Sequence, residues 1–329
     1  MKLERPSAIA ATLFADRRRW LLAAALWPAA KLVGCGGGGG GGTPTGGGGG
    51  ATPTGKVVVK DSSAMAVVDT ATGSATATSG SASNSKPGIG VSRNGFVADI
   101  RNYTGGDQWD VAILSLTLAT VKTYTVSHLG GTPTSAVALN VDATRWAYSV
   151  NEETSSSNGT RIDRTYVNDL TSGALLARLD GLSEPTFADN GELYVRSADD
   201  KLHAFDTSLH DQGALAITVA ETFGAYGASP DGRYVAFENG SPVGSQISVL
   251  DRTTGTTWIA TAAPVLACSV PVFSPDGKFL AFQQAGSSAG HYVHVIAFEP
   301  GTTKTIDDGS ALRTNGQLLS CSARFGWAR

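Results

Sequence analysis

The chain has 329 residues, with 25 basic and 28 acidic side chains, a formal net charge of −3 and 41 glycines. No cluster of lysines or arginines follows residue 31, so the sequence lacks the positive surface that binding to a nucleic-acid backbone requires. The composition therefore excludes nucleic acid as the expected partner and describes a weakly acidic, glycine-rich chain.

The N-terminal segment 1–35 has the features of an export signal. A run of three arginines ends at Arg19 and precedes an apolar stretch from Trp20 to Ala30. This stretch contains Pro28 and is shorter than the roughly 20 residues that a membrane-spanning helix needs. We therefore predict a signal peptide over 1–35 rather than a transmembrane anchor.

The last four residues of this segment, Leu32-Val33-Gly34-Cys35, resemble the bacterial lipobox. In that family of signals the cysteine becomes the first residue of the mature chain and carries the lipid. The resemblance implies that Cys35 is the lipid attachment site and holds the chain at a membrane. Because Gly36 rather than aspartate follows, it also implies a location on the periplasmic side of the outer membrane.

The export route stays open between two alternatives. The segment from Asp16 to Leu22 resembles the twin-arginine signal, because paired arginines are followed by an aromatic residue and leucines. The same arginines also suit the basic start of a Sec signal. Both routes deliver the chain across the inner membrane.

Segment 36–55 is predicted to be a flexible tether. It consists mainly of two glycine runs separated by Thr-Pro-Thr. Glycine-rich chain behaves as a coil, so this segment has an expected reach of roughly 25 Å. The rest of the chain, 56–329, is then the folded domain.

A phrase of nine residues occurs twice in this domain, at Ser229–Phe237 and at Ser274–Phe282. Each copy has Ser-Pro-Asp-Gly, typical of a type I turn, and then an aromatic and aliphatic run that favours a strand. The turn glycines are 45 residues apart, a repeat length typical of a propeller blade. Because both copies use them, we assign a structural role in the turns to Asp231, Gly232, Asp276 and Gly277.

Weaker copies of the phrase centre on Gly95, Thr144 and Gly191, and the spacings between copies run from 41 to 49 residues. Five blades follow directly. The segment Lys56 to Thr78 supplies three more strands, and the C-terminal segment to Arg329 supplies the innermost strand of the same blade. We predict an all-β fold, a six-bladed β-propeller closed by one C-terminal strand plus three N-terminal strands, with five to seven blades compatible with the spacings.

The Ser-Pro-Asp-Gly phrases and the strands that follow them resemble the TolB-like, WD-type propeller repeats. The resemblance covers about residues 55–329 and implies the propeller fold. It implies no activity, because one fold hosts many functions. TolB proteins also carry a separate N-terminal α/β domain, where this chain has the glycine tether.

The residue types that bind metals or perform catalysis form no recognisable site. His291 and His294 have the spacing of two ligands on a helix, but on a strand they point to opposite faces. His128, His203 and His210 are scattered over loops and blade edges and are expected to be solvated or hydrogen-bonded. We therefore predict no catalytic residue, no metal site and no cofactor.

Two cysteines remain if Cys35 carries the lipid. Cys268 and Cys321 have similar surroundings in the sequence, which places both in the innermost strands of adjacent blades. In an oxidising compartment a disulfide between them would pin the closing strand and contribute roughly 4 kcal/mol in the chain-entropy model. Such a bond requires Cα atoms within about 7 Å, and two buried thiols are the alternative.

Propellers usually bind ligands near the mouth of the central channel. Four residues align with positions on or just before the inner strands, and they are candidates for binding a ligand or partner on the grounds of the fold alone: Glu184, Glu221, Tyr226 and Arg324.

The sequence favours a non-enzymatic lipoprotein of the bacterial cell envelope that binds a protein or a small polar ligand. The alternative is a metal-dependent propeller enzyme of the lactonase or lyase kind, with its site at the channel mouth. A third interpretation is a purely structural spacer. Acidic or histidine side chains converging at one mouth of the channel would favour the enzyme, and the sequence shows no regular set of them.

Overall fold

The computed structural model describes residues 52–61, 64–80, 88–105, 107–128, 131–153, 161–219, 226–241, 244–262, 268–285, 290–306, 310–321 and 324–329. All of them belong to the unit Gly41–Arg329. Cys35, the rest of segment 1–51 and Glu221 lie outside the described residues. Within the described ranges, no helix has the length and apolar character needed to cross a membrane.

The two strong turn phrases close on themselves through their serine and aspartate side chains. The Ser229 hydroxyl donates to Asp231 Oδ1 at 2.5 Å and accepts from the Tyr234 N–H at 2.9 Å. Gly232 has φ +71°, a conformation that favours glycine. The same contacts recur at Ser274, Asp276, Gly277 and Phe279. Each turn therefore fixes where the next strand starts.

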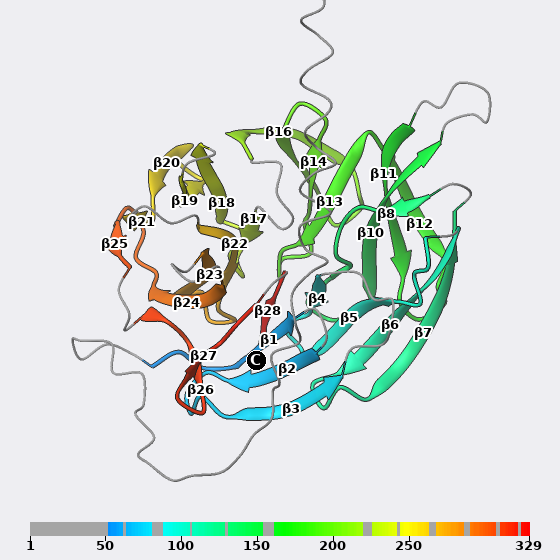
Figure 1. Cartoon of the computed structure of the whole chain (residues 1–329). Coiled ribbons are helices and arrows are strands. Elements are labelled where there is room, and N and C mark those ends of the chain that lie inside the picture. Colours follow the sequence, from blue (N-terminus) through cyan, green and yellow to red (C-terminus); the bar gives the residue numbers. More distant parts are fainter. Residues whose placement is uncertain are drawn as a thin grey trace, which may run out of the picture. The chain divides into compact units, whose positions relative to one another are not determined.

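The described strands form six blades, which we number 1 to 6 in chain order, and two short strand pairs beside blade 6 (Figure 1). Blade 1 contains, from the inside outward, β28 (Gly326–Ala328), β1 (Lys56–Asp61), β2 (Ala64–Asp69) and β3 (Ala75–Gly80). Blade 2 contains β4 (Ile89–Val91), β5 (Phe96–Arg101), β6 (Gln108–Ser115) and β7 (Thr120–Ser127). Blade 3 contains β8 (Thr132–Pro133) and β9 (Ala138–Leu139), then β10 (Arg145–Glu153), β11 (Arg161–Asp169) and β12 (Leu175–Asp180).

The other three blades follow the same plan. Blade 4 contains β13 (Leu182–Phe187), β14 (Leu193–Ser197), β15 (Lys201–Phe205) and β16 (Asp211–Thr218). Blade 5 contains β17 (Tyr226–Ala228), β18 (Tyr234–Ser241), β19 (Gly244–Asp251) and β20 (Thr256–Ile259). Blade 6 contains β22 (Cys268–Phe273), β23 (Phe279–Ala285) and β24 (His291–Ala297). Two short pairs accompany it, namely β21 (Thr261–Ala262) with β25 (Lys304–Thr305), and β26 (Arg313–Thr314) with β27 (Gln317–Leu318).

The ring is closed by the two ends of the domain. Strand β28 pairs antiparallel with β1, with Trp327 opposite Val57, and β2 and β3 complete the blade. The predicted six-bladed propeller, closed by one C-terminal and three N-terminal strands, is therefore confirmed. The pairing covers the edge of β1, which an open ring would leave exposed.

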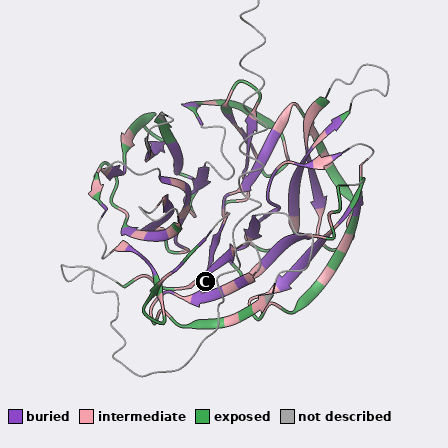
Figure 2. Cartoon of the chain, viewed as in Figure 1, coloured by how far each residue is buried: buried purple, intermediate pink, exposed green. Residues whose placement is uncertain are grey.

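The core lies between neighbouring blades because strand residues alternate between the two faces of each sheet. In β23, Phe279 and Ala281 join the apolar cluster shared with blade 1, whereas Leu280 and Phe282 join the cluster shared with blade 5. Figure 2 shows buried residues along the inner strands and exposed residues along outer strands such as β3 and β7. The interior is thus a set of interblade layers around a central channel.

Candidate functional site

The central channel is lined by the innermost strands β28, β4, β9, β13, β17 and β22, which contact one another in turn around the axis. In blades 2 to 6 each inner strand leads into the turn of its repeat, so these turns gather at one end of the channel, the turn end. We call the opposite end, where the inner strands begin, the mouth. The space enclosed measures about 80 Å³, enough for a few water molecules or one small group.

Glycines let the inner strands approach closely. A Cβ atom on Gly90 would lie 1.8 Å from the Val137 carbonyl oxygen, and one on Gly227 would lie 2.4 Å from that of Pro271. Neither distance is compatible with a side chain. Only glycine therefore fits at these two positions, and the close approach of the inner strands that it permits keeps the channel narrow.

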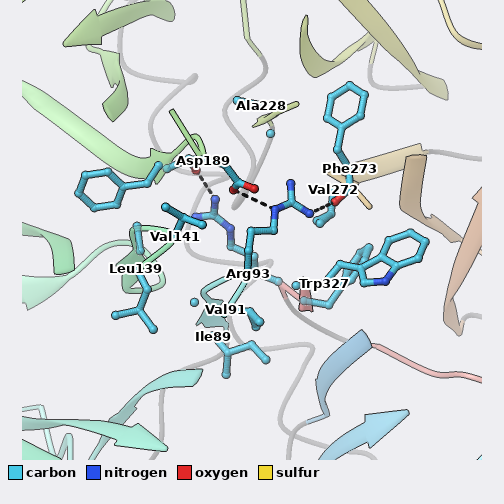
Figure 3. Close-up of a pocket in the computed structure, with 18 of the residues that line it drawn as sticks. Ile89, Val91, Arg93, Leu139, Val141, Asp189, Ala228, Val272, Phe273 and Trp327 are labelled. Carbon is cyan, nitrogen blue, oxygen red and sulfur yellow. Dashed lines mark hydrogen bonds and ion pairs between the residues drawn. The ribbon is translucent and has the colours of Figure 1, made fainter. Parts of the chain in front are cut away.

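An arginine closes the turn end (Figure 3). Arg93, which follows β4 of blade 2, forms an ion pair with Asp189 of blade 4 at 3.0 Å and donates to the Phe273 carbonyl oxygen of blade 6. Burial lowers the pKa of Arg93 and raises that of Asp189, and the attraction between the two charges opposes both shifts. One side chain thus fastens three alternate blades, which is a structural task.

The mouth holds a different constellation. Arg196 Nη1 lies 3.2 Å from Glu184 Oε1, and the Tyr226 hydroxyl donates to the Glu184 carbonyl oxygen. From the opposite side of the ring, Arg324 donates to the Pro185 carbonyl oxygen at 3.3 Å and to the Thr186 hydroxyl. Blades 1, 4 and 5 therefore contribute to one cluster, the mouth cluster, made of Glu184, Arg196, Tyr226 and Arg324.

The fold explains the backbone conformation at Glu184, but it does not explain why the side chain there is a carboxylate. Glu184 has φ +57° at an irregularity in the β13–β14 ladder, directly before Pro185. Val270 has φ +52° at the matching irregularity of blade 6, directly before Pro271. Proline has no N–H to donate, so it suits such a bulge. Because blade 6 forms the same bulge with a valine, the bulge does not explain the charge at Glu184.

Burial dominates the electrostatics of the mouth cluster. It raises the pKa of Glu184 to about 7, against the opposing effects of Arg196 and Arg324. It also lowers the pKa of Arg324 and raises that of Tyr226. Glu184 Oε2 is buried and has no hydrogen-bond partner, and no ion pair of Arg324 occurs within the described ranges. The mouth thus carries the carboxyl group of Glu184, whose pKa is about 7, and the guanidinium group of Arg324, which has no ion-pair partner in the described part of the chain.

Sequence reasoning located most of this cluster. The structure brings Glu184, Tyr226 and Arg324 together, whereas Glu221 lies outside the described residues. Arg196 was missed, although a charged residue among the apolar positions of β14 could have signalled it.

The expected disulfide is not formed, because Cys268 and Cys321 are both buried thiols. Cys268 packs on the face of blade 6 that meets blade 5, and Cys321 packs on the face that meets blade 1. Cys321 is also not part of the innermost strand, since its N–H donates to the His291 carbonyl oxygen at 3.0 Å beside β24. The sheet separates the two sulfur atoms, and burial raises the pKa of Cys268 to about 12.

Within the ranges that the structure describes, no three histidine, cysteine, aspartate or glutamate side chains gather closely enough to hold a metal ion. The histidines are not equivalent, however. His128 is hydrogen-bonded to Tyr148 and Glu152, as the sequence predicted, but it also lies in a cluster of aromatic rings between blades 2 and 3 that the sequence did not predict.

Ring and channel define the chain as a six-bladed β-propeller with a charged mouth, and solved structures share this fold. TolB from Acinetobacter baumannii is 17% identical, with a TM-score of 0.52 over 73% of this chain and 68% of that chain. A protein described as TolB from Agrobacterium tumefaciens is 15% identical, with a TM-score of 0.52 over 78% of this chain and 88% of its own. At these identities the likeness concerns the fold alone. No family model and no curated protein matches the chain.

Proposed function

We propose that this chain is a binding scaffold of the bacterial cell envelope, which holds a protein segment or a small polar ligand at the mouth of its propeller. The observation that carries the proposal is the mouth cluster, in which Arg324 crosses the channel to blade 4 and has no ion pair in the described part of the chain. A partly buried cation of this kind favours a ligand that brings a carboxylate or another acceptor.

A comparison of blade 4 with blade 6 indicates that the charges of Glu184 and Arg196 are not needed for packing. Blade 6 has Val270 and Gln283 at the positions that correspond to Glu184 and Arg196 of blade 4. Gln283 donates to the Cys321 carbonyl oxygen at 2.9 Å and satisfies the fold without a charge. The charged pair at the mouth is therefore an addition to the repeat, and recognition of a ligand explains it.

The proposed location rests on the segment before the propeller. Acylation of Cys35, at the end of Leu32-Val33-Gly34-Cys35, would anchor the chain at the periplasmic side of the outer membrane, after export by the Sec or the twin-arginine route. The tether 36–55 would then give the propeller freedom to reach a partner. Mass spectrometry of the full chain and of Cys35→Ser tests this, since only the unsubstituted chain should carry acyl groups and stay with membranes.

The binding role is tested with the full chain in detergent as bait for a detergent extract of the envelope of its own organism. We expect a saturable partner that Arg324→Met loses and that the double variant Glu184→Val with Arg196→Gln, built from the blade 6 residues, binds at least about tenfold more weakly. Arg145→Ala is the control and should bind normally, because Arg145 is a half-buried arginine at the turn end that donates to the Thr207 carbonyl oxygen.

Equal capture by all four proteins would contradict a site at the mouth. If no partner is captured and elemental analysis of the same sample finds a stoichiometric metal ion, the metal-dependent propeller enzyme replaces the scaffold as the better interpretation.

A further inference from the structure

A second cavity lies away from the channel, between the outermost strand of blade 2 and the sheet of blade 3. Strand β7 supplies one wall, and β10, β11 and the start of β12 supply the other. Its volume is about 290 Å³, near the lower end of the roughly 300 to 1,000 Å³ of small-molecule sites. We call it the interblade pocket. It shares no lining residue with the channel.

The pocket is lined by a ladder of nearly parallel aromatic rings. Tyr124 of β7 stacks on Trp146 with ring centroids 5.1 Å apart, Trp146 stacks on Tyr148 at 5.1 Å, and Tyr148 stacks on Tyr166 at 5.4 Å. Trp146 and Tyr148 are two positions apart on β10, so their side chains lie on the same face of the strand, toward blade 2. Stacking holds the rings rigidly, and their edges and partly covered faces form an apolar wall of the pocket.

A hydrogen-bond network at one end of the ladder holds its rings in place. Glu152 accepts from His128 Nδ1 and from the Tyr166 hydroxyl at 2.7 Å, and its other oxygen pairs with Arg164 at 2.6 Å. His128 Nε2 meets the Tyr148 hydroxyl at 2.9 Å. Burial lowers the pKa of His128 against the attraction of Glu152, which favours the neutral ring, and no described lysine, arginine, aspartate or glutamate lines the pocket. The pocket therefore suits an uncharged ligand.

Two buried N–H donors at the ladder have no partner. Asn168 is 6% exposed and Trp146 is 2% exposed, both line the pocket, and Asn168 Nδ2 and Trp146 Nε1 make no hydrogen bond. They are opposite each other on β11 and β10. A buried donor left unsatisfied costs about 1–3 kcal/mol, so a ligand with acceptor oxygens would relieve both.

We propose that the interblade pocket binds the ring of a neutral carbohydrate. A sugar ring presents an apolar C–H face to aromatic rings and hydroxyl oxygens to N–H donors, which are the two chemistries that the pocket offers together. A purely apolar ligand would leave Asn168 and Trp146 unsatisfied. The charges beside the pocket are already engaged, since Lys122 donates to the Leu170 and Thr171 carbonyl oxygens and Glu152 pairs with Arg164. Leu175, 56% exposed at the rim, extends the apolar surface toward a further sugar unit.

The test is titration of the full chain with cellobiose, maltotriose and di-N-acetylchitobiose, followed by tryptophan emission and by calorimetry. We expect saturable binding of at least one of them with one site per chain. Asn168→Ala and Trp146→Phe, which remove one unpartnered donor each, should weaken that binding about tenfold, the loss of one hydrogen bond. Both variants also remove buried atoms and should lower the Tm, so the affinities are compared at a temperature at which each variant is folded.

Trp258→Phe is the matched control. It removes an unpartnered indole N–H in blade 5, outside the pocket, and should leave sugar affinity unchanged. Absence of saturable binding to all three sugars overturns the proposal, and so does equal affinity of the Asn168→Ala, Trp146→Phe and control proteins. Saturable binding of the peptide acetyl-Tyr-Pro-Tyr-amide in place of any sugar would assign the pocket to a protein segment instead.

Discussion

At the scale of single residues, this propeller places charges according to two different needs. Arg93 and Asp189 at the turn end form an ion pair that links blades 2, 4 and 6, although Asp189 Oδ2 has no hydrogen-bond partner in the described part of the chain. Glu184 at the mouth has Arg196 on one oxygen and no partner on the other. The first pair joins three blades and serves the fold, whereas blade 6 forms the bulge of Glu184 with the uncharged Val270, so we assign the charge at Glu184 to a ligand.

The raised pKa of Glu184 predicts a pH dependence of stability. Its pKa is about 7 in the folded chain against 4.5 for an ordinary glutamate, so between these values the folded state binds the extra proton. The free energy of unfolding therefore falls as the pH rises from about 5 to about 7, by up to about 3 kcal/mol at this group, and levels off above. Urea unfolding of Glu184→Gln across this range should lack this decrease.

Glu192→Gln is the control for that experiment. Hydrogen bonds from Arg252 and Tyr194 outweigh the effect of burial and lower the pKa of Glu192, so its titration lies below the range in question. A decrease that survives in Glu184→Gln would show that another group carries it.

At the scale of strands, inner-strand glycines decide how tightly the blades meet. We predict that Gly90→Ala lowers the free energy of unfolding by about 3 kcal/mol or more, because the added Cβ would lie 1.8 Å from the Val137 carbonyl oxygen. Gly255→Ala, at φ +71° with open space around it, should cost only about 1 kcal/mol of backbone strain. Urea unfolding of both variants measures the difference, and equal losses would refute close packing as the reason for Gly90.

At the scale of the whole molecule, closure of the ring is the cooperative step. Removal of residues 326–329 deletes β28, including Trp327 at 1% exposure, and uncovers the edge of β1. We expect loss of a single sharp thermal transition and association in size-exclusion chromatography. Arg329→Ala, which keeps the strand and the N–H that bonds the Arg93 carbonyl oxygen, should behave like the parent chain. A truncated chain that stays monomeric with an unchanged Tm would contradict this view.

The sequence by itself determined what is repeated and local. The Ser-Pro-Asp-Gly phrases specify turns through contacts between residues at most five positions apart, and their spacing together with that of the weaker copies predicts about six blades. The three mouth residues Glu184, Tyr226 and Arg324 could be chosen because repeat alignment predicts which positions face the channel.

Only the tertiary structure decided what depends on how separate blades meet. Cys268 and Cys321 looked equivalent in sequence, but Cys268 lies in β22 and Cys321 lies beside β24, and the two pack on opposite faces of blade 6. The interblade pocket joins Tyr124 of one blade to Trp146 and Tyr166 of the next. Such contacts join strands of different sheets, and no local pattern specifies them, because they depend on the rotation of one blade against its neighbour.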